Sequence, residues 1–182
     1  MSNEFPAALR RTANLLGALA CEVSDRLENM LKAHPNQTDS AAAALNLVEA
    51  VPGMSNVQLS QALKLSHPAT VRLVAKLQSE GLIDVRDASD KRAVALHVTA
   101  KGRRRVAALV SDRNQALAQM VAVLSDAEQQ QLARLMSKLM TPLVDDVSRA
   151  EYICRLCDFA SCPHEACPVE GAEELLRRAS NG

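Results

Sequence analysis

The sequence predicts a mainly helical chain that carries one small β-hairpin. Its 182 residues are 48% hydrophobic and 23% charged, which is the composition of a folded globular protein. Alanine and leucine, two strong helix formers, dominate the composition, whereas aromatic residues make up only 2% of it. Apolar residues recur at three- and four-residue steps in the outer segments, and two short runs rich in isoleucine and valine stand between them.

The same composition excludes several classes of protein. The apolar content is too high, and the net charge of zero too small, for a disordered chain. No stretch approaches the roughly 20 uncharged apolar residues of a membrane span. Arg10 and Arg11 precede a short apolar run, but the helical pattern continues beyond it, so a secretion signal is not expected. Since Phe5, Tyr152 and Phe159 are the only aromatic residues, stacked rings for single-stranded nucleic acid and an all-β sandwich are disfavoured.

Two helices are predicted in the N-terminal part of the chain. The first is amphipathic and begins near Pro6, and the breaker-rich loop at 34–39 ends it. The second is capped by Asp39 or Ser40 and runs to about Ala50, where the sequence Val-Pro-Gly stops it.

Two short helices and a hairpin follow. Ser55 caps a third helix, and a tight turn leads to Ser66, which caps a fourth helix that ends just before Gly81. The runs at 82–86 and 93–99 are separated by a polar turn and form the hairpin. Two helices joined by a tight turn and followed by a hairpin constitute a winged helix-turn-helix.

The next helices are long. One is predicted from about Ala100, and a capping box formed by Ser125 and Glu128 opens another. Pro142 ends or kinks that helix, because proline in a helix interior costs about 3 kcal/mol. Thr141 is expected to cap its continuation into the cysteine-rich tail.

The helix-turn-helix segment is suited to a polyanion. Between Lys64 and Arg105 the chain carries ten basic and four acidic residues, a net charge of +6, so the rest of the chain carries −6. On the outward face of the fourth helix, Arg72 is the best candidate for a bidentate contact to guanine in the major groove. His67, at the start of this helix, can donate to a base or to a phosphate.

The hairpin tip carries a second basic cluster. Arg92 can reach a narrow minor groove, and Asp90 can hold it there through a salt bridge. A solvated helix face and an ordinary polar turn are the alternatives for these two surfaces. The expected DNA-binding residues are Ser66, His67, Pro68, Val71, Arg72, Ala75, Lys76, Arg86, Asp90, Lys91 and Arg92.

The segment 56–102, NVQLSQALKLSHPATVRLVAKLQSEGLIDVRDASDKRAVALHVTAKG, resembles the core of MarR-family transcriptional regulators. Three motifs carry the resemblance in order: R-L-V-x-x-L-x-x-x-G-L-I, then R-D-x-x-D-x-R at the hairpin, then L-x-V-T-x-x-G. The resemblance implies a homodimer held by the first and last helices. Such a dimer would place two recognition helices ~34 Å apart over a pseudo-palindromic operator in double-stranded DNA.

The implied organisation has four parts. A dimerisation helix occupies 1–37, the winged helix-turn-helix lobe 38–100, further dimerisation helices 101–150, and a cysteine-rich metal- or cluster-binding tail 151–182. The outer helices are long and amphipathic and have few partners within one chain, which agrees with a dimer.

Four cysteines of the tail have the spacing C-x2-C-x4-C-x4-C, at Cys154, Cys157, Cys162 and Cys167. We expect a cytoplasmic protein with reduced thiols, in which such a group indicates a bound ion or cluster. An iron–sulfur cluster of the 4Fe–4S type is favoured because proline follows two of the cysteines, and zinc is the alternative because structural zinc sites accept four thiolates. His164 can replace one thiolate. Cys21 is expected to be a small buried hydrophobe rather than a ligand.

We therefore expect a dimeric DNA-binding regulator, a repressor, whose four-cysteine cluster senses redox state, oxygen or iron. The alternative is a regulator that binds a small phenolic or organic-acid effector between its dimer helices and its DNA-binding lobes, with structural zinc on the cysteines. An enzyme is not expected, because the sequence contains no glycine-rich phosphate loop, no H-E-x-x-H motif and no recognisable Ser-His or Cys-His pairing.

Overall fold

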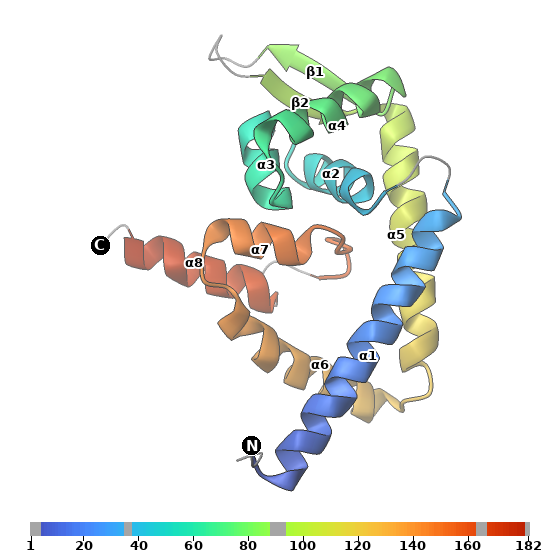
Figure 1. Cartoon of the computed structure of the whole chain (residues 1–182), viewed down its shortest axis with the longest axis vertical. Coiled ribbons are helices and arrows are strands. Elements are labelled where there is room, and N and C mark those ends of the chain that lie inside the picture. Colours follow the sequence, from blue (N-terminus) through green and yellow to red (C-terminus); the bar gives the residue numbers. More distant parts are fainter. Residues whose placement is uncertain (1–4, 35–37, 88–93, 163–166, 181–182) are drawn as a thin grey trace.

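The computed structural model describes residues 5–34, 38–87, 94–162 and 167–180 (Figure 1). The elements in chain order are α1 (Ala7–Lys32), α2 (Asp39–Ala50), α3 (Asn56–Leu63), α4 (His67–Ser79), β1 (Ile83–Asp87), β2 (Val94–Val98), α5 (Ala100–Val121), α6 (Asp126–Met140), the 3₁₀ turn η1 (Thr141–Leu143), α7 (Val147–Cys154) and α8 (Pro168–Ser180).

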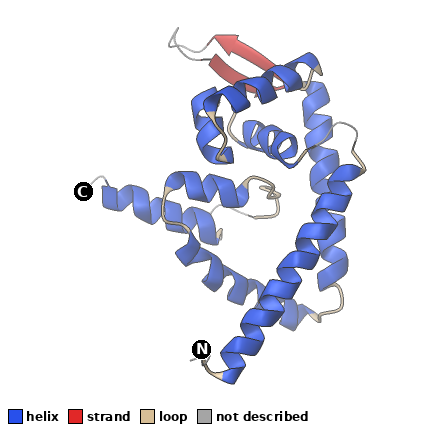
Figure 2. Ribbon diagram, viewed as in Figure 1, coloured by secondary structure: helices blue, strands red, loops and turns tan. Residues whose placement is uncertain are grey.

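The long helices α1 and α5 pack against each other, and a lobe made of α2, α3, α4 and the hairpin lies at one end of them (Figure 1). On the side of the lobe away from the hairpin, α7 packs against α3, and α8 packs against α7 and α6. Within the described residues, the antiparallel pair β1–β2 is the only sheet (Figure 2). The predicted fold class, mainly helical with a small β-hairpin, is therefore confirmed. None of the described helices is long and apolar enough to cross a membrane.

The lobe is built around α2. Every residue from 41 to 48 is buried, because α3, α5 and β2 all pack against this short helix. Its Leu45 belongs to one apolar cluster with Leu59 of α3, Leu77 of α4 and Leu96 of β2. Burying a leucine side chain fully contributes about 1.5–3 kcal/mol, so this cluster holds the helix-turn-helix and the hairpin on a common core.

Two predictions about the N-terminal half are wrong. Thr38, rather than Asp39 or Ser40, caps α2, because its hydroxyl accepts a hydrogen bond from the backbone N–H of Ala41 at 3.2 Å. Cys21 is exposed on α1 and not buried. Its neighbours along that helix are exposed as well, so the apolar face of α1 has little to pack against within one chain.

The chain beyond α6 also differs from the prediction. Thr141 does not cap a continuous helix, because Thr141 and Pro142 both lie in η1. The helix resumes only after Asp146, whose carboxylate caps α7 by accepting the N–H of Arg149 at 2.8 Å. The last helix, α8, is absent from the sequence prediction, although a proline stands at its first position, where proline is favoured.

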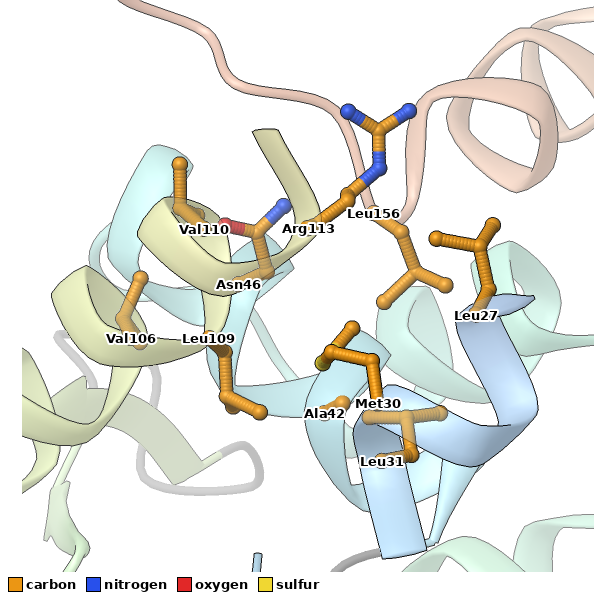
Figure 3. A pocket seen from close by; sticks show the side chains of 10 residues that line it. All are labelled: Leu27, Met30, Leu31, Ala42, Asn46, Val106, Leu109, Val110, Arg113 and Leu156. Atoms are coloured by element: carbon orange, nitrogen blue, oxygen red, sulfur yellow. The ribbon is translucent and has the colours of Figure 1, made fainter. Parts of the chain in front are cut away.

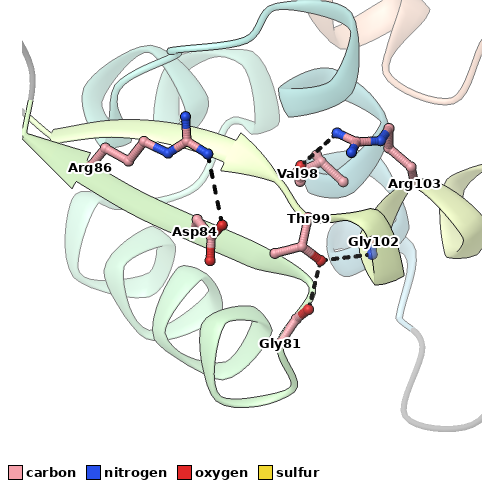
Figure 4. A network of polar contacts seen from close by, with 7 residues as sticks. All are labelled: Gly81, Asp84, Arg86, Val98, Thr99, Gly102 and Arg103. Carbon is pink, nitrogen blue, oxygen red and sulfur yellow. Dashed lines mark hydrogen bonds and ion pairs between the residues drawn. The ribbon is translucent and has the colours of Figure 1, made fainter.

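The wing and its two flanking helices meet at Thr99. β1 and β2 pair with Ile83 opposite Val98. Directly after β2, the hydroxyl of Thr99 donates to the carbonyl oxygen of Gly81 at 2.7 Å and accepts the N–H of Gly102 at 3.0 Å (Figure 4). Since Gly81 follows α4 and Gly102 lies in the first turn of α5, one hydroxyl ties the end of α4 to the start of α5.

The replacement Gly102→Ala is expected to destabilise the protein. An added Cβ would collide with the carbonyl oxygen of Leu82 and the side chain of Val98. Overpacking of this kind lowers the free energy of unfolding by about 1–3 kcal/mol, which urea denaturation would measure. Gly171→Ala in α8 is the matched control, because nothing lies within 4 Å of its added Cβ. Equal loss of stability in the two variants would contradict this account of Gly102.

Candidate DNA-binding surface and four-cysteine site

The turn between α3 and α4 is fixed at both helix ends. A capping box at Ser55 starts α3. At the other end, Lys64 adopts a left-handed conformation (φ 54°), and the N–H of Leu65 donates to the carbonyl of Ser60 at 3.0 Å, as in a Schellman motif. Ser66 then caps α4. Among the described residues, Lys64 is the only non-glycine with positive φ, so this turn is strongly specified.

The two faces of α4 are distinct. Thr70, Val74 and Leu77 are buried and pack into the lobe. The opposite face is exposed and carries Ser66, His67, Pro68, Val71, Arg72, Ala75 and Lys76, the residues predicted to contact DNA. Small side chains surround Arg72 on this face, so a base edge in a major groove can approach it without steric conflict.

The structure places only part of the predicted wing surface. Arg86 lies on β1, with its guanidinium 3.9 Å from the carboxylate of Asp84 (Figure 4). Their side chains are 64% and 58% exposed, so this ion pair is weak and does not withdraw Arg86 from solvent. The predicted tip residues Asp90, Lys91 and Arg92 lie outside the described residues.

Two basic residues of the positively charged segment extend the junction at Thr99. The Lys101 ammonium donates to the carbonyl of Glu80 at 2.7 Å. The Arg103 guanidinium donates to the carbonyl of Val98 at 3.1 Å, a contact drawn in Figure 4. These carbonyls lie at the end of α4 and the end of β2. The two cations therefore stabilise the placement of α4 and the hairpin on α5.

The four cysteines form two thiol pairs. Cys154 is hydrogen-bonded to Cys157, and Cys162 to Cys167, and the two pairs lie close enough to influence each other electrostatically. The bond from Cys154 and, to a smaller extent, the charges of Arg113 and Arg155 together lower the pKa of the Cys157 thiol to about 7. Donating that bond, together with burial, raises the pKa of Cys154. Burial and the Cys167 contact raise the pKa of Cys162 to about 11.

The donor set suits an iron–sulfur cluster or zinc, since both bind thiolates. Within the described parts of the chain, however, no group of three or more His, Cys, Asp or Glu side chains is arranged so that it could hold a metal ion. His164, the suggested replacement ligand, lies outside the described residues.

Sequence reasoning missed the residues that hold the cysteine loop on the lobe. The side-chain amide of Asn46, in the middle of α2, donates to the backbone carbonyls of Arg155 at 3.2 Å and of Cys157 at 3.0 Å. From α5, the amide of Asn114 donates to the carboxylate of Asp158 at 2.6 Å. One signal for the first contact is visible in the sequence: a buried asparagine within an apolar helix must find hydrogen-bond partners.

A cation of α5 also faces the cysteine loop. The guanidinium of Arg113 stands at the rim of an apolar cleft that Leu156 enters from the loop (Figure 3). Its Nε atom is buried and lacks a hydrogen-bond partner among the described residues. An arginine in this position lowers the cost of negative charge on the nearby thiolates.

Comparisons with known proteins agree with this geometry. Residues 38–93 match the sequence model of the MarR family. A MarR family protein from Bacillus stearothermophilus is 22% identical, with a TM-score of 0.68 over 76% of this chain and 96% of that chain. FabT from Streptococcus pneumoniae, solved in complex with DNA, is 18% identical, with a TM-score of 0.66 over 75% and 98% of the two chains. MepR, a transcription regulator of the Staphylococcus aureus multidrug efflux pump MepA, is 20% identical, with a TM-score of 0.62 over 72% and 97%. Residues 38–93 therefore carry the sequence pattern of the MarR family, and the described part of the chain has the fold of these structures.

Proposed function

We propose that this chain is a transcription regulator, a repressor, which binds double-stranded DNA through α4 and the wing. The observation that carries the proposal is the exposed face of α4, presented by a capped helix-turn-helix beside a hairpin that carries the exposed Arg86. The complex of FabT with DNA, a protein whose fold this chain shares, supports this use of the lobe. The net charge of +6 between residues 64 and 105 would supply attraction to phosphates, while α4 would supply base contacts.

The replacement Arg72→Ala is expected to weaken binding and relax the preference at one base pair. Loss of a bidentate contact to guanine costs about 1–3 kcal/mol, which fluorescence anisotropy on a duplex selected from a random pool would measure. Arg134→Ala on α6 is the control, since it removes the same charge from an exposed position outside the lobe. Wild-type affinity and base preference in the Arg72→Ala protein would rule out the assigned role.

We propose that a second copy of the chain covers the apolar faces of α1 and α6. The large apolar side chains exposed on these two helices are Leu9, Leu15, Leu16, Leu19, Leu135, Met136 and Leu139. Each is 46–56% exposed in the single chain, and so many together indicate an interaction surface. A dimer formed there would present two α4 helices to a pseudo-palindromic operator, ~34 Å apart.

The replacement Leu16→Asp is expected to convert the dimer into a monomer, because a carboxylate on an apolar interface would lose its hydration without gaining a partner. Sedimentation velocity at micromolar concentration would measure the change. Val57→Asp is the matched control, because Val57 is similarly exposed, at 54%, but lies on α3. Either a monomeric wild type or a dimeric Leu16→Asp protein would overturn the assignment of this face.

We further propose that the four cysteines of the tail hold a 4Fe–4S cluster that senses redox state, oxygen or iron. When bound, such a cluster changes charge on oxidation or is lost. The chain would supply four thiolates, and Arg113 would offset part of their negative charge. Asn46 would fix the backbone on both sides of Leu156, within the loop that carries Cys157.

Protein purified without oxygen is expected to be brown, with about four iron and four sulfide per chain. The double replacement of Cys154 and Cys157 by serine should abolish the colour and the iron, whereas Cys21→Ser should retain both, because Cys21 lies on α1. Visible absorbance and metal analysis of the same samples would measure this. If the protein is colourless and contains one zinc per chain, the cysteines hold a structural ion and not a cluster. If it contains no metal, both proposals for the cysteine site are wrong.

The second candidate function is a regulator that senses a small phenolic or organic acid and has structural zinc on the cysteines. The observation that favours it is an open cleft of about 510 Å³ between α1 and the cysteine loop. Lys32 and Arg155 line this cleft together with their ion-pair partners Glu28 and Asp39, at 3.0 and 3.7 Å. An acidic effector would bind by displacing these two carboxylates from the cations. Stabilisation of the zinc-loaded protein by an aromatic acid such as salicylate, measured as a shift in Tm, would support this alternative.

A further inference from the structure

Leu156 joins the cysteine loop to the core of the lobe. It lies between Cys154 and Cys157 in the sequence, and its side chain enters the apolar cleft formed by α1, α2 and α5 (Figure 3). About 20 Å³ of free volume remains there, roughly the room of one water molecule. Leu156 packs against both the main core cluster and the smaller cluster around Leu31 and Leu109. A shift of this side chain would therefore disturb the packing of both clusters.

The backbone around Leu156 is held as firmly as its side chain. The amide of Asn46 bonds the carbonyls on either side, those of Arg155 and Cys157, at 3.2 and 3.0 Å. Asn46 is 6% exposed and lies on the most buried helix of the lobe. Both of its contacts are with the loop, so a displacement of the loop would leave a buried amide unsatisfied, which is costly.

A second contact connects the segment before the cysteines to the helix-turn-helix. The ring of Tyr152, on α7, has the ammonium of Lys64 at 5.0 Å and the guanidinium of Arg155 at 4.1 Å from its centroid. Lys64 is the left-handed residue that sets the angle between α3 and α4. Tyr152 therefore contacts the side chain of the one residue of the turn that adopts a left-handed backbone conformation.

We propose that residues 152–158 act as a bracket, through which the state of the four cysteines sets the position of α4 relative to α5. Leu156 and Asn46 transmit a movement of the loop to α2, and Tyr152 transmits it to the turn at Lys64. This inference rests on the proposed occupation of the cysteine site by a cluster or ion, and it names the path by which that occupation would reach the DNA-binding surface. The path runs within one chain and does not require the dimer interface.

The test compares the full-length wild type with Leu156→Ala and Tyr152→Leu. Phe159→Ala is the matched control, because Phe159 lies on the same loop but is 43% exposed. Each protein is loaded anaerobically with iron and sulfide, or with zinc, and half of it is stripped with a chelator. The affinity of both forms for the selected duplex is then measured, and metal is counted in each loaded sample.

The wild type and Phe159→Ala are expected to change affinity by about 5- to 150-fold between the two forms, which is the usual range for coupled sites. Leu156→Ala and Tyr152→Leu should bind as much metal as the wild type, but their DNA affinity should differ by less than about twofold between the loaded and the stripped form. The wild-type ratio in both of these variants, at equal metal content, would overturn the bracket.

A second readout separates this inference from the proposed occupation of the site. In metal-free protein, hydrogen exchange of α2 and of residues 64–79 should be faster in Leu156→Ala than in Phe159→Ala, because the bracket contacts do not depend on metal. Leu156→Met nearly conserves the side-chain volume and should keep the slow exchange of the wild type. This result would show that the faster exchange in Leu156→Ala does not come from general unfolding. If the wild type binds no metal but this difference is found, the proposed sensor fails and the bracket stands. Equal exchange rates in all variants would overturn the bracket alone.

Discussion

The hydroxyl of Thr99 is the contact on which the geometry of the DNA-binding lobe depends. It joins three elements at one point: the end of α4 at Gly81, the end of β2, and the start of α5 at Gly102. The close approach of α5 to the backbone of Leu82 is possible only because residue 102 has no side chain. The Thr99 contacts therefore help to place α4, the hairpin and α5 relative to one another. The cations Lys101 and Arg103 and the core packing around α2 reinforce this placement.

The cysteine tail adds a second set of fixed contacts on the opposite side of the same lobe. Its loop meets α2 and α5, and α7 meets α3, so the tail contacts the elements from which the DNA-binding surface is built and does not hang free. The lobe is thus held by hydrogen bonds on two sides, those of Thr99 on one side and those of Asn46 on the other. If the proposed bracket couples the tail to α4, the coupling must act in both directions: whatever stabilises one arrangement of the tail would also favour the matching arrangement of α4, and a ligand bound by α4 would favour the matching state of the tail.

The sequence was sufficient where the signal is local. Caps such as Ser55 and Ser66, the split between buried and exposed residues on α4, and the two strands of the hairpin follow from neighbouring residue types, and the structure agrees with them. Prediction failed where several local solutions compete. Thr38 and its two successors are all good helix caps, and only the packing of α2 decides between them. The contacts of Asn46 with the cysteine loop span 109 and 111 residues, and no pattern of spacing in one sequence specifies such a pair.

That separation along the chain has a consequence for how the molecule is made. Chains emerge from the ribosome N-terminus first, and their domains generally fold as units in that order. α2 and most of α5 are complete well before Leu156 is synthesised, so the lobe can assemble while the cleft that receives this side chain still holds water. During synthesis, each molecule is therefore expected to have a folded α4 before residues 152–158, which contact the lobe, have been made. The cleft between α1, α2 and α5 is therefore completed by a residue that is synthesised after all three helices.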